Sequence, residues 1–219
     1  MNNPNCPRYY RGILVALTMA LMLATTGCIG GMAQLLYVIK GHKSPAEYPG
    51  LADKRVAVVC VSDASAYGPD TLSYTVSKHV SIKLANSDEK ISLVPPGEIE
   101  EFLDLNGWDE SQIGSLGAEV KADMVVVIEV GAYTIHEGST LFKGRSDLTV
   151  KVFDIEKDGQ QVYERGPEEF VFPENGRPSL QTSERQFEAF YLARLTDYIS
   201  NLFIEHDRLD SFADDAMTN

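Results

Sequence analysis

The sequence predicts an α/β fold, a mixed sheet flanked by helices, that follows an N-terminal signal and a tether. Two observations predict this class. Between residues 54 and 121, short apolar runs alternate with amphipathic segments, which is typical of a sheet that starts with parallel strands. From residue 122, β-branched runs and a hairpin turn predict antiparallel strands. The expected order is β-α-β-α-α-β-β-β-α within a single domain over residues 54–205.

The expected domain begins with the strand KRVAVVCVSD. This run alternates poorly between apolar and polar residues, as expected of a strand buried on both faces. After a loop, Pro69 and Asp70 can start a helix over residues 71–86. Its apolar residues recur at near-helical spacing, so we expect one face to pack on the sheet: Leu72, Val76, Val80 and Leu84.

A second strand and two further helices are expected over residues 91–121. The run ISLVP predicts the strand, and Pro96 suits the first turn of a helix that stops near Gly107. Asp109 and Gln112 can form a capping box for the next short helix, ESQIGSLGAEVKA.

Three antiparallel strands and a final helix complete the expected domain. ADMVVVIEVGAYTIHE is rich in β-branched residues, and beyond a loop at 138–145 the pair Asp158-Gly159 predicts a hairpin. A helix from about Ser183 to Glu205, which Ser183 and Gln186 can cap, follows. Residues 206–219 are expected to form a disordered acidic tail. The apolar face of the helix comprises Phe187, Phe190, Tyr191, Leu195, Tyr198, Ile199 and Leu202.

The first 27 residues have the three-part anatomy of a secretory signal peptide. A basic start with Arg8 and Arg11 precedes the apolar run ILVALTMALMLA, and small residues precede Cys28. As a helix, this apolar run rises about 18 Å, which is less than the roughly 30 Å hydrocarbon core of a bilayer. The run alone is therefore a poor membrane span.

The small residues before Cys28 resemble a bacterial lipobox, in which the cysteine sulfur takes a diacylglyceryl group and the leader is cut before it. Lipoboxes usually carry Leu three residues before the cysteine, where this chain has Thr25. On this interpretation, residues 1–27 are a lipoprotein signal peptide and cleavage separates Gly27 from Cys28. Residues 28–53 are then a lipidated cysteine and a flexible tether. Two or three acyl chains, palmitate among them, anchor a protein firmly to the bilayer.

Two alternatives to lipidation of Cys28 remain. No charged residue occurs over residues 13–39, so an uncleaved signal helix could anchor the chain instead. Gly27, Gly30 and Gly31 oppose this helix, at about 1 kcal/mol each relative to alanine. The other alternative is a buried structural cysteine.

Both lipidation and a signal anchor predict a membrane-attached protein on the periplasmic side, because the leader's arginines stay on the inner flank. Lipoproteins with Asp after the cysteine are retained in the inner membrane. Ile29 occupies that position here, which favours the outer membrane.

The charge of the chain excludes some partners. With 19 Lys and Arg against 32 Asp and Glu, the net charge is −13. Loss of the leader, which holds two arginines and no acid, takes it to −15. Such a surface repels nucleic acid and anionic lipid, so no nucleic-acid partner is expected.

The order of these segments resembles a known group of envelope domains. KRVAVVCV, a helix, ISLVPPGEIEEFL, IGSLGAEVKADMVVVIEVGAY and the hairpin LTVKVFDIEKDGQQVYE are similar to the periplasmic α/β domain of CsgG-type curli-secretion lipoproteins. They are also similar to penicillin-binding-protein activator lipoproteins and to the amino-terminal domain of TolB. The resemblance covers roughly residues 54–200 and implies a fold and a compartment. CsgG-type pores use long amphipathic hairpins, and the loop at 137–145 is too short for one.

The remaining reactive residues form no recognisable site. Cys60 lies in an apolar strand, where an inert core thiol is expected, and no Gly-rich phosphate loop follows that strand. A solvated face is the better interpretation of the carboxylates at Glu98, Glu100 and Glu101. We therefore predict no catalytic residue, metal ligand or cofactor. The histidines lack the spacing of metal ligands and are His42, His79, His136 and His206.

The function expected from these observations is that of a noncatalytic, membrane-anchored lipoprotein. Its domain is expected to bind or help assemble another envelope component, and Trp108 and Tyr133 are either interface aromatics or core residues. A signal-anchored ligand-binding module that uses the loop at 62–69 is a second hypothesis. A hydrolase with dispersed catalytic residues is a third. The oligomeric state does not follow from the sequence.

Overall fold

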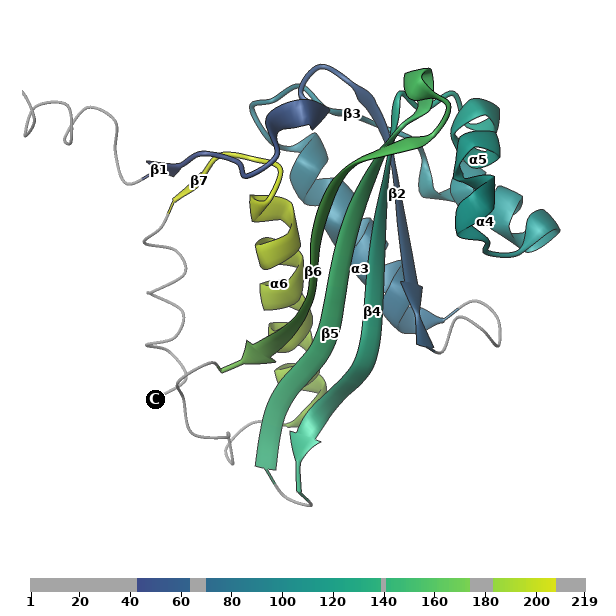
Figure 1. Cartoon of the computed structure of the whole chain (residues 1–219). Helices are drawn as coiled ribbons and strands as arrows, with labels where there is room; N and C mark the ends of the chain where they lie inside the picture. Colours follow the sequence, from purple (N-terminus) through teal and green to yellow (C-terminus); the bar gives the residue numbers. More distant parts are fainter. Residues whose placement is uncertain (1–42, 64–69, 139–140, 174–182, 208–219) are drawn as a thin grey trace, which may run out of the picture. The chain divides into compact units, whose positions relative to one another are not determined.

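The computed structural model describes residues 43–63, 70–138, 141–173 and 183–207, and its main feature is a five-stranded mixed sheet (Figure 1). The predicted α/β class is therefore confirmed. The strand order is β3-β2-β4-β5-β6. The strands are β2 (Arg55–Ser62), β3 (Ser92–Leu93), β4 (Met124–Glu137), β5 (Leu141–Asp154) and β6 (Gln160–Phe172).

The pairing of the strands follows the predicted pattern. Both β3 and β4 pair with β2 in parallel, whereas β5 is antiparallel to β4 and to β6. β3 and β4 flank β2 on opposite sides, so the connection from β2 to β3 and the connection from β3 to β4 run in opposite directions across the sheet. Because connections between parallel strands are right-handed, the helices of these two connections lie on opposite faces of the sheet.

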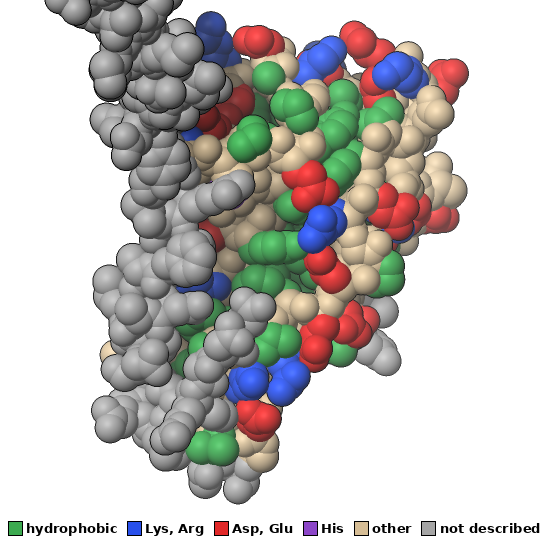
Figure 2. All heavy atoms as spheres, turned by 60° about the vertical axis from the view of Figure 1, so that its left-hand side comes forward, with side chains coloured by type: hydrophobic (Ala, Val, Ile, Leu, Met, Phe, Trp, Pro, Cys, Tyr) green, Lys and Arg blue, Asp and Glu red, His purple; other side chains and the backbone are tan. Residues whose placement is uncertain are grey.

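The helices accordingly form two layers (Figure 1). On one face lie α3 (Thr71–Ala85) and α6 (Glu184–Asn201), joined by an ion pair between Lys83 and Asp197. On the other lie α4 (Pro96–Asn106) and α5 (Ile113–Glu119). On the side where β6 and α6 lie, hydrophobic side chains are exposed next to acidic and basic ones (Figure 2). Short 3-10 turns are η1 (Pro49–Leu51), η3 (Glu110–Gln112) and η4 (Ile155–Lys157).

Two of the predicted helix caps, at the starts of α3 and α6, are confirmed. The Asp70 carboxylate accepts a hydrogen bond from the Ser73 backbone at 3.0 Å at the start of α3. Ser183 and Gln186 form the predicted capping box of α6. The predicted helix after Asp109 is divided into η3 and α5. The predicted capping box with Gln112 is wrong, because the Asp109 carboxylate accepts its hydrogen bond from the Ser111 backbone and caps η3 instead.

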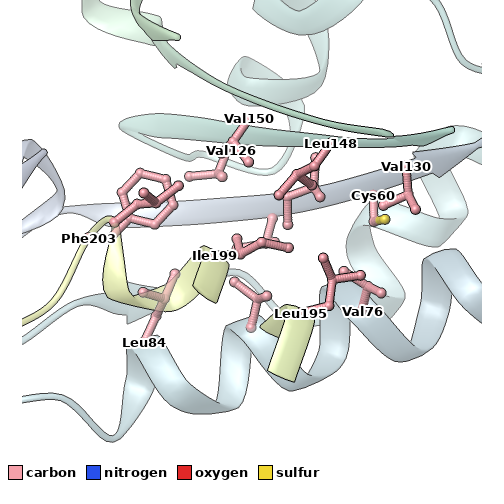
Figure 3. Close-up of a cluster of buried hydrophobic side chains, with 14 of the residues drawn as sticks. Cys60, Val76, Leu84, Val126, Val130, Leu148, Val150, Leu195, Ile199 and Phe203 are labelled. Atoms are coloured by element: carbon pink, nitrogen blue, oxygen red, sulfur yellow. The ribbon is translucent and has the colours of Figure 1, made fainter. Parts of the chain in front are cut away.

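The larger core lies between the sheet and the α3–α6 layer. Alternate residues of β4 and β5 point toward the helices, and Cys60 lies among them (Figure 3). Cys60 is buried, which confirms its predicted place in the core, and burial raises the pKa of its thiol well above the ordinary value. The facing side chains include Val126, Val130, Leu148 and Val150 from the sheet and Val76, Leu84, Leu195 and Ile199 from the helices.

A smaller core lies on the opposite face, under α4 and α5. Ala57, Val59, Val125 and Val127 are buried there, so β2 and β4 are covered on both faces. This double burial explains why the β2 sequence does not alternate between apolar and polar residues.

Several boundaries differ from the prediction. β5 begins at Leu141 within the predicted loop, because Phe142 and Gly144 face α6 and pair with residues of the neighbouring strands. The predicted strand at 91–95 is paired only over Ser92–Leu93. The final helix ends at Asn201 instead of Glu205, and Phe190, predicted on its apolar face, is exposed because it lies to one side of the face that packs on the sheet. The predicted hairpin turn is confirmed, with Asp158 and Gly159 both at positive φ.

The start of the predicted C-terminal tail also differs from the prediction. Within the predicted tail, His206–Asp207 is strand β7, which forms a two-stranded sheet with β1 (Lys43–Ser44). The signal peptide, Gly27, Cys28, His42, the loop at 64–69 and the tail from 208 lie outside the described residues. No helix within the described ranges is long and apolar enough to cross a membrane.

Candidate functional site

Residues 44–53 are part of the folded domain, although the sequence predicts that they belong to the tether. Leu51 is fully buried in the larger core, and the backbone N–H of Tyr48 donates to the carbonyl of Leu202 at 2.8 Å. The compact unit that holds the domain accordingly begins at Ser44 instead of residue 54. The Pro, Gly and charged residues of this segment are typical of a linker, but here Pro49 occupies the first turn of η1 and thereby directs Leu51 inward.

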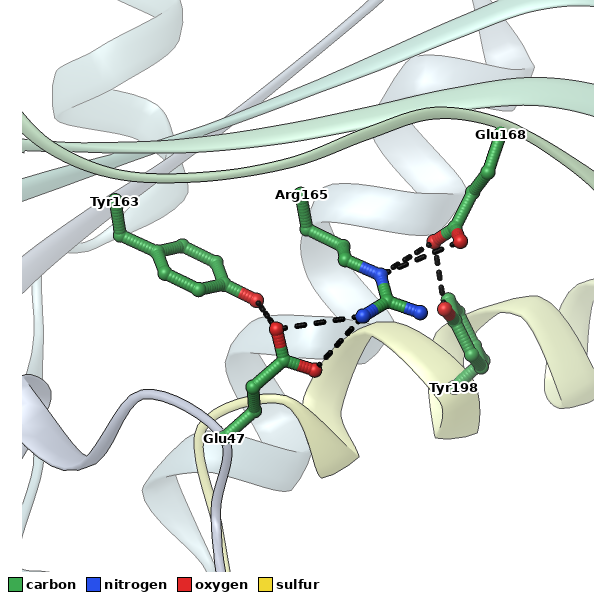
Figure 4. A network of polar contacts seen from close by, with 5 residues as sticks. All are labelled: Glu47, Tyr163, Arg165, Glu168 and Tyr198. Carbon is green, nitrogen blue, oxygen red and sulfur yellow. Dashed lines mark hydrogen bonds and ion pairs between the residues drawn. The ribbon is translucent and has the colours of Figure 1, made fainter.

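A polar network fixes this segment to β6 and α6 (Figure 4). The Glu47 carboxylate accepts a hydrogen bond from the Tyr163 hydroxyl at 3.0 Å and pairs with the Arg165 guanidinium at 3.2 Å. Arg165 also pairs with Glu168 at 3.2 Å, and Glu168 accepts a hydrogen bond from the Tyr198 hydroxyl at 2.6 Å. One guanidinium therefore bridges carboxylates that lie more than a hundred residues apart in sequence.

Aromatic rings surround the network. The ring of Tyr48 lies on that of Tyr163 with centroids 4.9 Å apart and meets Phe203 edge-on at 6.4 Å. Beyond Arg165, the ring of Phe170 contacts Tyr198 at 5.4 Å. Each such pair contributes roughly 0.5–1.5 kcal/mol beyond the burial of its area, so this junction is held by packing as well as by charge.

The contacts of the network shift the pKa values of Glu168 and Tyr198. Partial burial alone would raise the pKa of Glu168, but hydrogen bonds from Tyr198 and Arg165 hold it below its usual range. Burial and the bond to Glu168 raise the pKa of Tyr198 to about 12. Glu168 therefore stays ionised and Tyr198 stays protonated at neutral pH, which suits a structural contact rather than proton transfer.

Replacing Glu168 with glutamine should lower the free energy of unfolding at pH 7 by about 1 kcal/mol, since a charged acceptor is lost. A lowered folded-state pKa stabilises the fold above the unfolded pKa of about 4.3, and this stabilisation is lost as pH falls through the folded value. Urea unfolding should therefore separate the variant from the native chain at pH 7 and bring the two together once the pH has fallen below the folded-state pKa of Glu168.

Glu169→Gln is the matched control for that measurement. Glu169 pairs with Arg145 at the surface, where an exposed ion pair contributes about 0.5 kcal/mol or less. An equal loss in both variants, or a Glu168→Gln effect that persists at low pH, would contradict the assigned role of Glu168.

The structure scatters the other reactive residues. His136 lies 3.9 Å from Glu184 and beside the ring of Phe142, whereas His79 is exposed on α3. Within the described ranges, no three His, Cys, Asp or Glu side chains are grouped closely enough to hold a metal ion. The predicted solvated face of α4 is confirmed, since Glu98, Glu100 and Glu101 are all exposed.

The two aromatic residues left open by the sequence are both partly buried. Tyr133 contacts the ring of Tyr191 and donates a hydrogen bond to Glu188 at 3.1 Å, so it packs against α6. Trp108 packs against the smaller core. Sequence reasoning missed Glu47 and Arg165 as partners. Its one available signal was the two-residue spacing of Tyr163 and Arg165, which allows two strand residues to share a face.

These features define an α/β domain whose entering segment is bound into the fold by charge and aromatic contacts. No family model and no curated protein matches the chain. Among solved structures it is similar to the lipoprotein GNA1162 from Neisseria meningitidis, at 14% identity and a TM-score of 0.43 over 67% of this chain and 98% of that one.

Two further structures are similar. The PelC dodecamer from Paraburkholderia phytofirmans shares 12% identity at a TM-score of 0.42, over 75% of this chain and 96% of that one. The LpoB C-terminal domain from Salmonella enterica shares 12% identity at a TM-score of 0.37, over 55% of this chain and 82% of that one. With TM-scores below 0.5, these similarities assign neither a family nor a function to the chain.

Proposed function

We propose that this protein is a noncatalytic bacterial lipoprotein that Cys28 anchors on the periplasmic side of a membrane, where its α/β domain binds another envelope component. The single observation that carries the proposal is Cys28 itself, directly after small residues and a basic, then apolar leader. The outer membrane is the favoured location because Ile29 follows the cysteine.

The start of the folded unit at Ser44 supports this role. Residues 29–43 separate Cys28 from that unit, and a fully extended chain of this length spans at most about 50 Å. The domain is therefore held close to the membrane surface. The Glu47–Arg165 contact determines where the connecting chain enters it, so the anchor and the domain are joined at a defined point.

A binding role fits the chemistry of the described residues better than catalysis does. The thiol of Cys60 is buried and has a raised pKa. Arg165 and the carboxylates that it contacts pair with one another in structural contacts instead of converging on an open space. An active site usually places perturbed titratable groups in a cleft. The ion pairs at Arg165 are therefore explained as structural contacts, and binding is the role that we infer for the domain.

Metabolic labelling with an alkynyl palmitate analogue tests the anchor. The native protein should carry the label, and its mature mass should lack residues 1–27. Cys28→Ser should lose the label completely and keep the leader, because serine has no thiol to acylate. Cys6→Ser is the matched control, since Cys6 lies in the removed leader and its loss should change neither result.

Retained labelling of Cys28→Ser would reject Cys28 as the acceptor. An unlabelled native protein that stays in the membrane fraction at full mass would instead establish the uncleaved signal anchor.

A further inference from the structure

The helical layer formed by α3 and α6 carries most of the large hydrophobic side chains that face solvent. In the described part of the chain four such residues are exposed, and three of them lie on these two helices. They are Tyr74 and Ile82, each 47% exposed, and Phe190, which is 59% exposed. The two helices lie side by side, joined by the ion pair between Lys83 and Asp197, so these side chains gather on one layer of the molecule (Figure 1).

Tyr74 and Ile82 belong to one exposed stripe of α3. Tyr74, Lys78 and Ile82 follow one another at four-residue intervals, so they lie on the same side of the helix. All three are exposed, and the Lys78 ammonium lies 5.4 Å from the centre of the Tyr74 ring. We call Tyr74, Lys78, Ile82 and Phe190 the α3–α6 outer surface.

The charge of this surface differs in sign from that of the whole chain. α3 contains two lysines and no acid, although the chain has 32 Asp and Glu and a net charge of −13. On α6, Asp197 pairs with Lys83 and with Arg194 at 3.9 Å, and the other acids contact side chains of β4. The net charge predicts that anionic lipid is repelled, but at physiological salt this repulsion is screened beyond about 8 Å. The lysines of α3 therefore determine the local interaction.

The chain that joins Cys28 to the domain has the same character. Residues 29–43 contain two lysines and no acid. This chain enters the domain just beyond the C-terminal ends of α6 and α3, where the Tyr48 N–H donates to the carbonyl of Leu202 at 2.8 Å and the Asp53 N–H donates to that of Glu89 at 3.1 Å. Fully extended, residues 29–43 span at most about 50 Å, whereas α3 is only about 22 Å long. The whole outer surface can therefore reach the membrane that holds Cys28.

We propose that the α3–α6 outer surface lies against anionic phospholipid of the membrane that anchors the chain. The proposal rests on the lipid anchor inferred above and adds a second contact with the same bilayer. The hydrophobic side chains of the surface enter the interface, and Lys78 meets the phosphates. In this orientation α4 and α5, which cover the opposite face of the sheet, point away from the bilayer and are accessible to another envelope component.

Fluorescence quenching tests the proposal on the full-length, lipidated protein in vesicles of phosphatidylcholine and phosphatidylglycerol. The fluorophore NBD is attached to Ala85→Cys, three residues from Ile82 on the same side of α3, or to Leu105→Cys on α4 as the matched exposed position. Native Cys60 is buried and does not compete for the label. A nitroxide on the lipid headgroup should quench the label at position 85 and leave position 105 unquenched. In vesicles of phosphatidylcholine alone, the quenching at 85 should fall.

Charge reversal tests the ionic part. Lys78→Glu should lower the ratio of membrane-bound to free outer surface, measured by quenching at position 85, about tenfold, because a repelled charge replaces an attracted one. Lys121→Glu makes the same change in net charge at an exposed position that follows α5, and it should leave the quenching unchanged.

Flotation of the same samples reports on the anchor separately. Protein that floats with the vesicles while position 85 stays unquenched, or is quenched equally at 85 and 105, would reject the lipid contact and leave the anchor in place. Equal quenching with and without phosphatidylglycerol, or equal effects of the two lysine variants, would reject the anionic headgroup as the partner. Protein that carries no lipid and does not float would overturn the anchor, and this contact with it.

Discussion

Replacing Gly144 with alanine is expected to lower the free energy of unfolding by about 3 kcal/mol. Gly144 lies on β5 facing α6, where a Cβ atom would overlap the ring of Tyr191. That ring is fully buried, and its hydroxyl donates to Ser146 at 2.7 Å, so it cannot move aside without losing a buried hydrogen bond. Urea denaturation followed by far-UV circular dichroism measures the difference.

Gly97→Ala is the control for the Gly144 prediction. No atom lies within 4 Å of a Cβ at Gly97, and the residue is in the first turn of α4, so alanine should leave stability unchanged or slightly higher. A second variant, Tyr191→Leu, should partly relieve the alanine at 144, giving a double variant less destabilised than the sum of the single ones. Strict additivity would show that the predicted overlap with Tyr191 is wrong.

Replacing Leu51 with alanine should lower the free energy of unfolding by about 3 kcal/mol, because a leucine with no exposed surface leaves a cavity in the larger core.

Truncation of the chain tests the same contacts of residues 44–53. A chain that starts at Ser44 should unfold cooperatively at nearly the full stability of the domain, whereas one that starts at residue 54 should be several kcal/mol less stable, since it also lacks the Tyr48 and Glu47 contacts.

Leu105→Ala is the control for this second prediction, because the solvent-exposed Leu105 side chain leaves no cavity. Its effect should stay within about 0.5 kcal/mol. Equal stability of the two truncated chains would instead mean that residues 44–53 are a tether, as their composition predicts.

The fold was predictable where one local pattern determined the structure. β2 and β4 are buried on both faces, so their sequences are continuous apolar runs that identify them as strands. The caps at Asp70 and Ser183 depend on residues three positions away, and they too were predictable. The start of β5 was not, because it depends on the packing of Phe142 and Gly144 against α6, far along the chain.

The junction at Glu47 was hidden for the same reason. The segment around Pro49 has the composition of a linker, and only its contacts with Leu202 and Arg165 make it part of the domain. Those partners lie more than a hundred residues away, and no local periodicity records such a pairing.

The sequence by itself determined the predictions that depend on adjacent residues: the leader and Cys28, the acidic charge, the order of strands and helices, the caps and the Asp158-Gly159 turn. Only the tertiary structure decided which face each helix covers, that the domain includes Leu51, that Arg165 bridges Glu47 and Glu168, and that Tyr74, Ile82 and Phe190 are exposed on one helical layer. The physical reason is one of range. Local dihedral preference and charge act within a few residues, whereas burial and ion pairing join residues that only the folded chain brings together.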